Sequence, residues 1–200
     1  GKNLAQNIIL SQFCQQQCVV DLKPMADLNQ INEAAFEVSK IEKKINYKKI
    51  KNFLDLEKKF GIKYIAPFDL RSSTFKKSTF DYCISTNTLE HIPKKDIISI
   101  FHEVKRVCKK GGSILAYIDY SDHYSHTDKS ISNLNFLKFS SQEWLKHNHN
   151  CHFQNRLRHH DFIKLFKDLD LKIKLEKSFF INQKYNFKIS IEFDPKIKTT

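Results

Sequence analysis

Short apolar runs alternate with longer amphipathic stretches along most of this chain. A short continuous apolar run is typical of a strand buried on both faces. Strands that alternate with helices favour a parallel sheet, because two parallel strands need a long crossover between them. The pattern therefore predicts an α/β fold with a mostly parallel sheet and helices on both faces, its strands being 18–20, 62–66, 80–85 and 113–120.

Helical spacing of apolar residues marks the segments between these strands. Ile97, Phe101, Val104 and Cys108 fall on one face of a helix, and Gly111-Gly112 is predicted to end it. Further helices are predicted over 4–13, within 28–60 before a C-capping Gly61, and over 161–169.

The C-terminal part follows a different pattern. Residues 171–180 and 185–193 alternate apolar and polar positions, which predicts an antiparallel strand pair. The polar segment 121–155 is long for a loop in a compact domain, and such loops are often functional. We expect one domain over residues 1–200, in which 121–160 is an insertion or lid over the substrate side.

Polar side chains stand at the ends of successive predicted strands. In an open α/β sheet the ligand lies beyond the carboxyl ends of the strands. Any single acid there is more often a cap of the next helix. Together, however, the series favours a nucleotide-like ligand, and its members are Asp21, Asp69, Ser85-Thr86-Asn87 and Asp119.

Charge and cysteine usage narrow the class of protein. The net charge is +12, from 34 Lys and Arg against 22 Asp and Glu, but the lysines are scattered along the chain. This indicates a solvated surface with weak attraction for phosphate-rich partners rather than a dedicated nucleic-acid surface. The five cysteines include no CxxC pair, and we expect a reducing, cytoplasmic compartment. No apolar run approaches about 18 residues, so no membrane span is expected.

The stretch FDYCISTNTLEHIPKKDIISIFHEVKRVCKKGGSIL, residues 80–115, resembles a known family. It is similar to the second half of class I S-adenosylmethionine-dependent methyltransferases of the Methyltransferase-11 type. That family shows an FD strand, an LEH turn and a helix ending in RVLKPGG. Lys110 stands here in place of the family's proline. The resemblance implies a Rossmann-like fold, S-adenosyl-L-methionine as cofactor, and methyl transfer as the activity.

The resemblance also implies roles for the strand ends of the first half. Asp21 would hold the two ribose hydroxyls of the cofactor, since a carboxylate offers acceptors to two neighbouring donors. Asp69 and Leu70 would border the adenine, with the Asp69 carboxylate accepting from the exocyclic amine.

The second half receives roles in the same way. Ser85 and Thr86 would lie under the cofactor, with Asn87 beside them. Glu90 and His91 would follow in the loop, and His91 would lie near the substrate. A structural role for His91, holding the loop before a proline, is equally compatible with the sequence.

The family's glycine-rich turn is absent from these 200 residues, which hold only four glycines. Such a turn lets the backbone approach the cofactor closely. Gly1 is interpreted as its last glycine and counted among the cofactor-binding residues. The first strand of the fold would then lie upstream, and the chain would be a fragment that binds cofactor poorly by itself.

The His-rich stretch 118–128 is the best candidate for work on the substrate. Methyl transfer to a hydroxyl needs a base, and His123 or Asp122 is predicted to be that base, with His126 on the substrate side. The same residues are compatible with a divalent metal at His123-x-x-His126, with a solvated loop, or with a histidine that fixes the loop. No metal site is assigned.

Two arginines and an aromatic group follow in the lid. Arg156 and Arg158 are predicted to clamp an anionic group of the substrate, the alternative being that they pair with acids or cap the next helix. Trp144, Phe136 and Phe139 are predicted to form the core of the lid.

The leading hypothesis is a methyltransferase that acts on a small-molecule or saccharide-like acceptor. A nucleic-acid methyltransferase, of the RNA class, is compatible with the positive charge but not favoured. A non-catalytic methyltransferase-fold binding subunit is compatible with the missing glycine-rich turn. A nicotinamide-dependent dehydrogenase is less favoured, because the antiparallel tail suits methyltransferases better.

Overall fold

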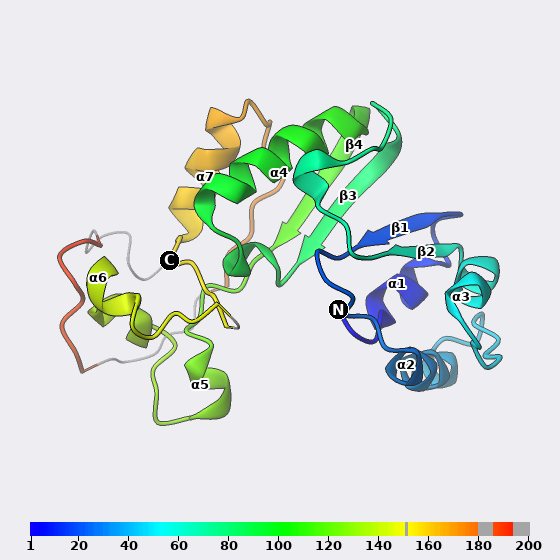
Figure 1. The fold of residues 1–200 in the computed structure, drawn as a ribbon, viewed down its shortest axis with the longest axis horizontal. Coiled ribbons are helices and arrows are strands. Elements are labelled where there is room, and N and C mark those ends of the chain that lie inside the picture. The colour runs from blue at the N-terminus through cyan, green and yellow to red at the C-terminus, as the bar shows by residue number, and fades with distance from the viewer. Residues whose placement is uncertain (151, 180–185, 194–200) are drawn as a thin grey trace. The chain divides into compact units, whose positions relative to one another are not determined.

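The computed structural model describes residues 1–150, 152–179 and 186–193. The chain divides into two compact units, Gly1–Ser73 (unit 1) and Thr74–Thr200 (unit 2). The expected α/β class, with parallel strands and flanking helices, is confirmed (Figure 1). The strands form two separate two-stranded parallel sheets, one in each unit, rather than one continuous sheet.

Unit 1 is built around the parallel pair of β1 (Gln17–Val20) and β2 (Ile62–Ile65), in which Val20 is the partner of Ile65. The helices α1 (Ala5–Leu10), α2 (Leu28–Ile41) and α3 (Phe53–Phe60) supply most of its core. Four side chains at the centre of that core are fully buried: Ile8, Ile31, Leu56 and Ile62.

Gly61 ends α3 and leads directly into β2, as the sequence predicts. Its φ is 65°, and its N–H donates to the carbonyl of Glu57. A Cβ at this position would lie 2.2 Å from the backbone oxygen of Gln15. Both the left-handed backbone and the close approach therefore require glycine.

Unit 2 is built around the parallel pair of β3 (Phe80–Thr86) and β4 (Cys108–Tyr117). The helices α4 (Lys94–Val107) and α7 (His159–Asp168) lie side by side on one face of this pair (Figure 1). Their buried side chains meet Ile114 and Ala116 of β4. The opposite face presents four side chains that are more than half exposed: Tyr82, Ile84, Leu115 and Tyr117.

The end of α4 differs from the sequence prediction. The helix stops at Val107, and Gly111-Gly112 lies inside β4 instead of ending the helix. The ladder is irregular here, with a register shift between Phe80 and Tyr82. A Cβ at Gly112 would lie 2.7 Å from the backbone oxygen of Asp81. The glycine therefore serves a close approach between two strands, a requirement that helical spacing does not reveal.

The predicted C-terminal antiparallel pair is wrong for the described part of the chain. Residues 171–179 and 186–193 form no strand, and 180–185 lie outside the described residues. Leu175, Phe179 and Ile191 are at least 72% exposed. Ile189 and Phe193 do pack, against the buried side chains of Phe136, Leu137 and Trp144, but no neighbouring strand pairs with this segment among the described residues.

The segment 121–160 carries short helical turns: α5 (Tyr124–Thr127), η3 (Asn135–Lys138) and α6 (Ser141–Trp144). Phe136, Leu137 and Trp144 form a small buried core, against which Phe139 packs. The prediction that these aromatic residues are core is confirmed. Ser140 and Glu143 form a capping box that starts α6. The described residues contain no helix with the length and apolar character needed to cross a membrane.

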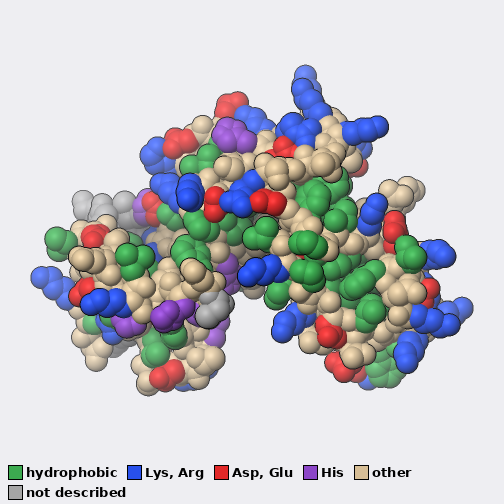
Figure 2. Space-filling model, viewed as in Figure 1, with side chains coloured by type: hydrophobic (Ala, Val, Ile, Leu, Met, Phe, Trp, Pro, Cys, Tyr) green, Lys and Arg blue, Asp and Glu red, His purple; other side chains and the backbone are tan. Residues whose placement is uncertain are grey.

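Lysine and arginine side chains are spread over the visible face of both units and interspersed with other side chains (Figure 2). This distribution is typical of a solvated surface rather than of one concentrated basic patch.

The N-cap of α2 provides a test of unit 1. The Asp27 carboxylate accepts hydrogen bonds from the backbone N–H groups of Asn29 and Gln30, both at 2.9 Å. We expect Asp27→Ala to lower the free energy of unfolding by about 1 kcal/mol, because these N–H groups lose their partner. Urea denaturation followed by far-UV circular dichroism measures the change. Glu37→Ala, which removes only an exposed pair with Lys40, is the control and should change stability by less than about 0.5 kcal/mol.

Candidate functional site

In unit 1, polar groups gather where β1 and β2 end. The Asp21 N–H donates to Ile65, and the Asp21 carbonyl accepts from Phe68, so the backbone holds this residue at the sheet edge. The Tyr64 hydroxyl donates to Asp21 Oδ2 at 2.9 Å and itself accepts from the Met25 N–H. Tyr64 thus orients the Asp21 carboxylate and leaves Oδ1 without a hydrogen bond to the described residues.

Asp69 follows β2 at the same edge, but its carboxylate already has a partner. The Arg71 guanidinium donates to both Asp69 oxygens, the shortest distance being 2.7 Å. Hydrogen bonds from the Arg71 side chain and backbone hold the pKa of Asp69 below its usual range. Asp69 is also the N-cap of the turn η1 (Leu70–Ser72), so Leu70 begins a short helical turn. A ligand that used Asp69 would share it with Arg71.

Gly1 is exposed, and no atom lies within 4 Å of the place where a Cβ would be. The structure therefore gives no steric reason for glycine at this position. Its predicted role in cofactor binding stays a prediction.

In unit 2, the parallel ladder brings another set of strand-end residues together. Ser85 and Thr86 end β3, and Thr86 is the partner of Tyr117 near the end of β4. Asn87 follows with φ of 48°, a conformation that asparagine tolerates, and its N–H donates to the carbonyl of Tyr117. The loops after β3 and β4 therefore start side by side.

The loop after β3 forms the turn η2 (Leu89–His91), which is held from both sides. Leu89 is buried in the core with α4. The Asn155 side chain donates to the carbonyls of Leu89 and Ile92, and the Asn155 N–H donates to the carbonyl of Glu90. His91 contacts the same segment, because its Nδ1 lies 2.9 Å from the carbonyl oxygen of Phe153.

Glu90 points inward and is 2% exposed. Neither carboxylate oxygen makes a hydrogen bond of normal geometry to the described residues. Burial raises the pKa of Glu90, opposed by its own backbone N–H, the His91 side chain and the backbone N–H of Asp119. A buried carboxylate without a strong partner is costly, so this side chain favours either a proton or a cation.

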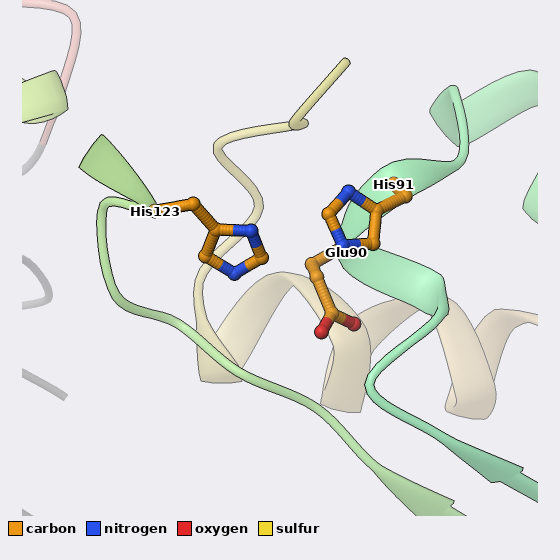
Figure 3. A group of neighbouring side chains, drawn as sticks. All are labelled: Glu90, His91 and His123. Atoms are coloured by element: carbon orange, nitrogen blue, oxygen red, sulfur yellow. The ribbon is translucent and has the colours of Figure 1, made fainter. Parts of the chain in front are cut away.

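His123 faces Glu90 and His91 from the loop after β4 (Figure 3). Its side chain is 10% exposed, and its ring centroid lies 4.8 Å from that of His91 and 4.7 Å from that of His126. Burial and the His91 charge lower the pKa of His123, whereas Asp119 opposes this shift. The imidazole is therefore neutral near pH 7 and offers a lone pair to a proton or a metal.

Asp122 lies next to His123 in sequence but is fully buried and turned away to hold the loop. Its Oδ1 accepts from the Tyr124 N–H and its Oδ2 from the Asn135 side chain, both at 2.9 Å. Both oxygens are used by structural contacts, which favours a loop-fixing role for Asp122. Of the two predicted bases, only His123 keeps an unoccupied basic atom among the described residues.

Asp119 and His126 flank the cluster. Asp119 Oδ1 accepts from the Ser121 backbone and hydroxyl, and the Ser121 hydroxyl lies 2.9 Å from His126 Nε2. Asp119 Oδ2 faces His123 Nε2 at 3.7 Å and His126 Nε2 at 3.5 Å. The loop after β4 thus adds a second carboxylate, that of Asp119, and the exposed His126 to the buried side chains of Glu90 and His123.

Both arginines of the predicted anion clamp are engaged elsewhere. Arg156 donates to the carbonyls of Phe136 and Phe139, and its guanidinium stacks over the rings of Trp144 and Phe193. It therefore ties the small lid core together.

Arg158 is 3% exposed and donates to the carbonyl of Tyr120. Burial lowers the pKa of Arg158 to about 10, while Tyr120, Asp161 and Asp119 oppose the shift. The guanidinium remains charged at neutral pH, but it lies inside the fold rather than toward a bound anion.

A hollow of about 1810 Å³ runs along β4 and the segment 171–179 in unit 2. Asp119 and His126 line one end, whereas Glu90, His91 and His123 do not line it. Much of this space lies beside the free edge of β4, where the predicted antiparallel pair is not formed. The histidine cluster, and not the hollow, holds the greatest density of chemically active groups.

The sequence placed Glu90 in the loop but assigned it no function. Leu89 and Ile92 anchor the turn in the core, but of the two residues between them Glu90 is buried and His91 is exposed, and only the structure shows this difference. The sequence Leu-Glu-His-Ile alone does not show which of its two polar side chains turns inward.

The role of Arg156 in holding the lid core provides a second test. We expect Arg156→Ala to lower the free energy of unfolding of unit 2 by about 1–3 kcal/mol, because two partly buried carbonyls lose their donor. Trp144 is the single tryptophan, so its fluorescence during urea unfolding reports on this region. Lys146→Ala, an exposed change in the same segment, is the control. Wild-type stability combined with weakened substrate binding would support the anion clamp instead.

Part of the chain is similar to a known protein family. Residues 23–116 match the family model described as a methyltransferase domain. This segment covers slightly less than half of the chain. It includes Asp69, the end of β3 and the Glu90–His91 turn, whereas Asp21 lies before its first residue and His123 lies after its last.

No curated protein matches the chain. Among solved structures, the crystal structure of the PH0226 protein from Pyrococcus horikoshii OT3 is 22% identical, with a TM-score of 0.40. The alignment covers 68% of this chain and 52% of that chain, so this chain spans about half of that protein's length.

Proposed function

We propose that this chain binds S-adenosyl-L-methionine and transfers its methyl group to a small-molecule or saccharide-like acceptor, because residues 23–116 match the family model described as a methyltransferase domain. The family match carries the proposal. It spans the end of β3 and the turn that presents Glu90 and His91, where the chemically active side chains of unit 2 gather.

In unit 1 we assign cofactor contacts to Asp21 and Asp69. The free Oδ1 of Asp21 suits a ribose hydroxyl, while Tyr64 holds the other oxygen in place. Asp69 with Leu70 is assigned to the adenine. In unit 2 we assign cofactor contacts to Ser85, Thr86 and Asn87 at the end of β3.

The acceptor is assigned to the histidine cluster of unit 2. A hydroxyl becomes a nucleophile toward the sulfonium methyl when it gives up its proton. His123 is neutral near pH 7 and has a buried ring nitrogen without a hydrogen bond, so we place the activation of the acceptor there. His91 and His126 flank it and provide further polar contacts for the acceptor.

The spread of lysines supports a small acceptor over an RNA. On the visible face, basic residues are interspersed with other side chains over both units, whereas an RNA acceptor would favour a concentrated basic face (Figure 2). A polyanion acceptor would also give binding that weakens steeply with salt.

Cofactor binding is tested by titration with S-adenosylhomocysteine. We expect Asp21→Ala to weaken the affinity about 10- to 100-fold, because a hydrogen bond to a charged group contributes about 1.5–3 kcal/mol. Asp69→Ala should weaken it less, since Arg71 already competes for that carboxylate. Isothermal titration calorimetry gives both values, with Glu37→Ala as a matched surface control. Unchanged affinity in both aspartate variants would reject the assignment.

The activation step is tested by His123→Ala. We expect the turnover number to fall about 10²- to 10⁴-fold, the usual contribution of a positioned proton acceptor, while the affinity for S-adenosylhomocysteine stays the same. Methyl transfer from labelled S-adenosylmethionine to a panel of saccharide and phenolic acceptors provides the readout. His102→Ala, an exposed change on α4, is the control. Equal turnover in the two variants would remove His123 from the mechanism.

A further inference from the structure

The buried carboxylate of Glu90 is the least satisfied polar group in unit 2 among the residues described. It is 2% exposed, and both of its oxygens lack a hydrogen bond of normal geometry. A charged group that is taken out of water needs a compensating partner. The structure offers no lysine or arginine side chain to this carboxylate among its described contacts, and the groups that face it are histidines.

His91 presents a lone pair toward this carboxylate. A carbonyl oxygen only accepts hydrogen bonds, so the contact of 2.9 Å with Phe153 requires the proton of His91 to sit on Nδ1. In the neutral ring Nε2 is then unprotonated. A histidine whose other ring nitrogen donates to a backbone carbonyl is the usual arrangement of a metal ligand, because this contact sets both tautomer and ring orientation.

His123 completes the group from the other loop. Its Nε2 is buried and has no hydrogen-bond partner among the described residues. One ligand atom from each of Glu90, His91 and His123 lies within 4.8 Å of the others. Figure 3 shows the three side chains reaching toward one another from the loops that follow β3 and β4.

A second possible group of metal ligands also contains His123, but its other side chains already have hydrogen-bond partners. Asp119, His123 and His126 also have ligand atoms within 4.8 Å of one another. Asp119 Oδ1, however, is bonded twice by Ser121, and the Ser121 hydroxyl also contacts His126. Glu90 has no such partner. The unsatisfied set is therefore the better cation site, with Asp119 as a neighbouring negative charge.

We propose that Glu90, His91 and His123 bind one divalent transition-metal ion of the class of Zn²⁺ or Fe²⁺. Two imidazoles and one carboxylate are a ligand set typical of these ions, whereas Ca²⁺ and Mg²⁺ favour oxygen ligands. Ligand atoms at about 2.0–2.1 Å from an ion lie closer together than 4.8 Å, so binding draws the three side chains inward. The two positive charges balance Glu90 and Asp119.

The use of this ion in methyl transfer rests on the proposed function, whereas binding itself does not. Three protein ligands leave positions open on the ion. An ion held by these residues would lower the pKa of an acceptor hydroxyl that met it, and the proton would leave to solvent. On this account the ion replaces His123 as the group that activates the acceptor, and the free Nε2 of His123 serves as a ligand of the ion instead of taking the proton.

The test is metal binding by the purified chain after treatment with a chelator. Isothermal titration with Zn²⁺ should show one tight site, and Co²⁺ should give the visible absorption of a histidine-ligated ion. We expect Glu90→Gln, His91→Ala and His123→Ala each to weaken Zn²⁺ binding at least tenfold, since even the loss of a supporting contact costs 10- to 100-fold. Mg²⁺ should give no comparable heat.

Two control variants separate this site from its alternatives. His102→Ala removes an exposed histidine on α4 and should leave the tight site unchanged. His126→Ala should weaken Zn²⁺ binding less than threefold. Loss of the tight site in His126→Ala but not in Glu90→Gln would overturn the ligand assignment, as would a wild-type chain without a tight site. His91 is exposed, so His91→Ala keeps the test valid even if the buried variants fold poorly.

The two proposals fail in different ways. A chain that binds S-adenosylhomocysteine and transfers methyl groups at full rate after metal removal would reject the use of the ion in methyl transfer and keep the proposed function, and a chain without a tight Zn²⁺ site would reject the ion itself. A chain that binds Zn²⁺ through the three residues but shows no affinity for S-adenosylhomocysteine would reject the proposed function and keep the ion.

Discussion

The parallel pairing of β3 with β4 is the constraint on which the chemistry of unit 2 depends. Parallel strands end at the same edge of a sheet, and the register of Thr86 with Tyr117 starts both following loops at neighbouring points. Glu90 and His91 on one loop thereby meet His123 on the other, although the long helix α4 separates them in sequence. The backbone ladder, and no direct bond between these side chains, brings the cluster together.

The packing around that ladder decides which polar groups face inward. Asp122, Arg158 and Glu90 are all almost completely buried, yet they differ in their partners. Asp122 is bonded by the Tyr124 backbone and by an asparagine side chain, and Arg158 donates to the Tyr120 carbonyl. These contacts favour a structural role for both. Of these three side chains, only Glu90 has no hydrogen bond of normal geometry to the described residues, which favours a binding role for it.

Elements whose cause is local were predictable from the sequence. The strands β1, β2 and β3 and the Gly61 cap follow from short apolar runs and from one residue that can adopt a left-handed backbone. Elements that depend on distant partners were not. Gly111-Gly112 looks like a helix end but serves the close approach of two strands. The alternation after residue 170 looks like a strand pair, yet the described residues there form no strand, and Ile189 and Phe193 pack against the segment 121–160 instead.

The sequence by itself determined the α/β class, the polar residues at the strand ends and the resemblance to methyltransferases, because each depends on residue type and short-range spacing. Only the tertiary structure decided what those residues do. In the structure Arg156 donates to backbone carbonyls, and Asp122 accepts hydrogen bonds from its own loop. Glu90 is buried beside His91 and His123. Burial and hydrogen-bond partners come from segments far apart in the chain, so no local pattern encodes them.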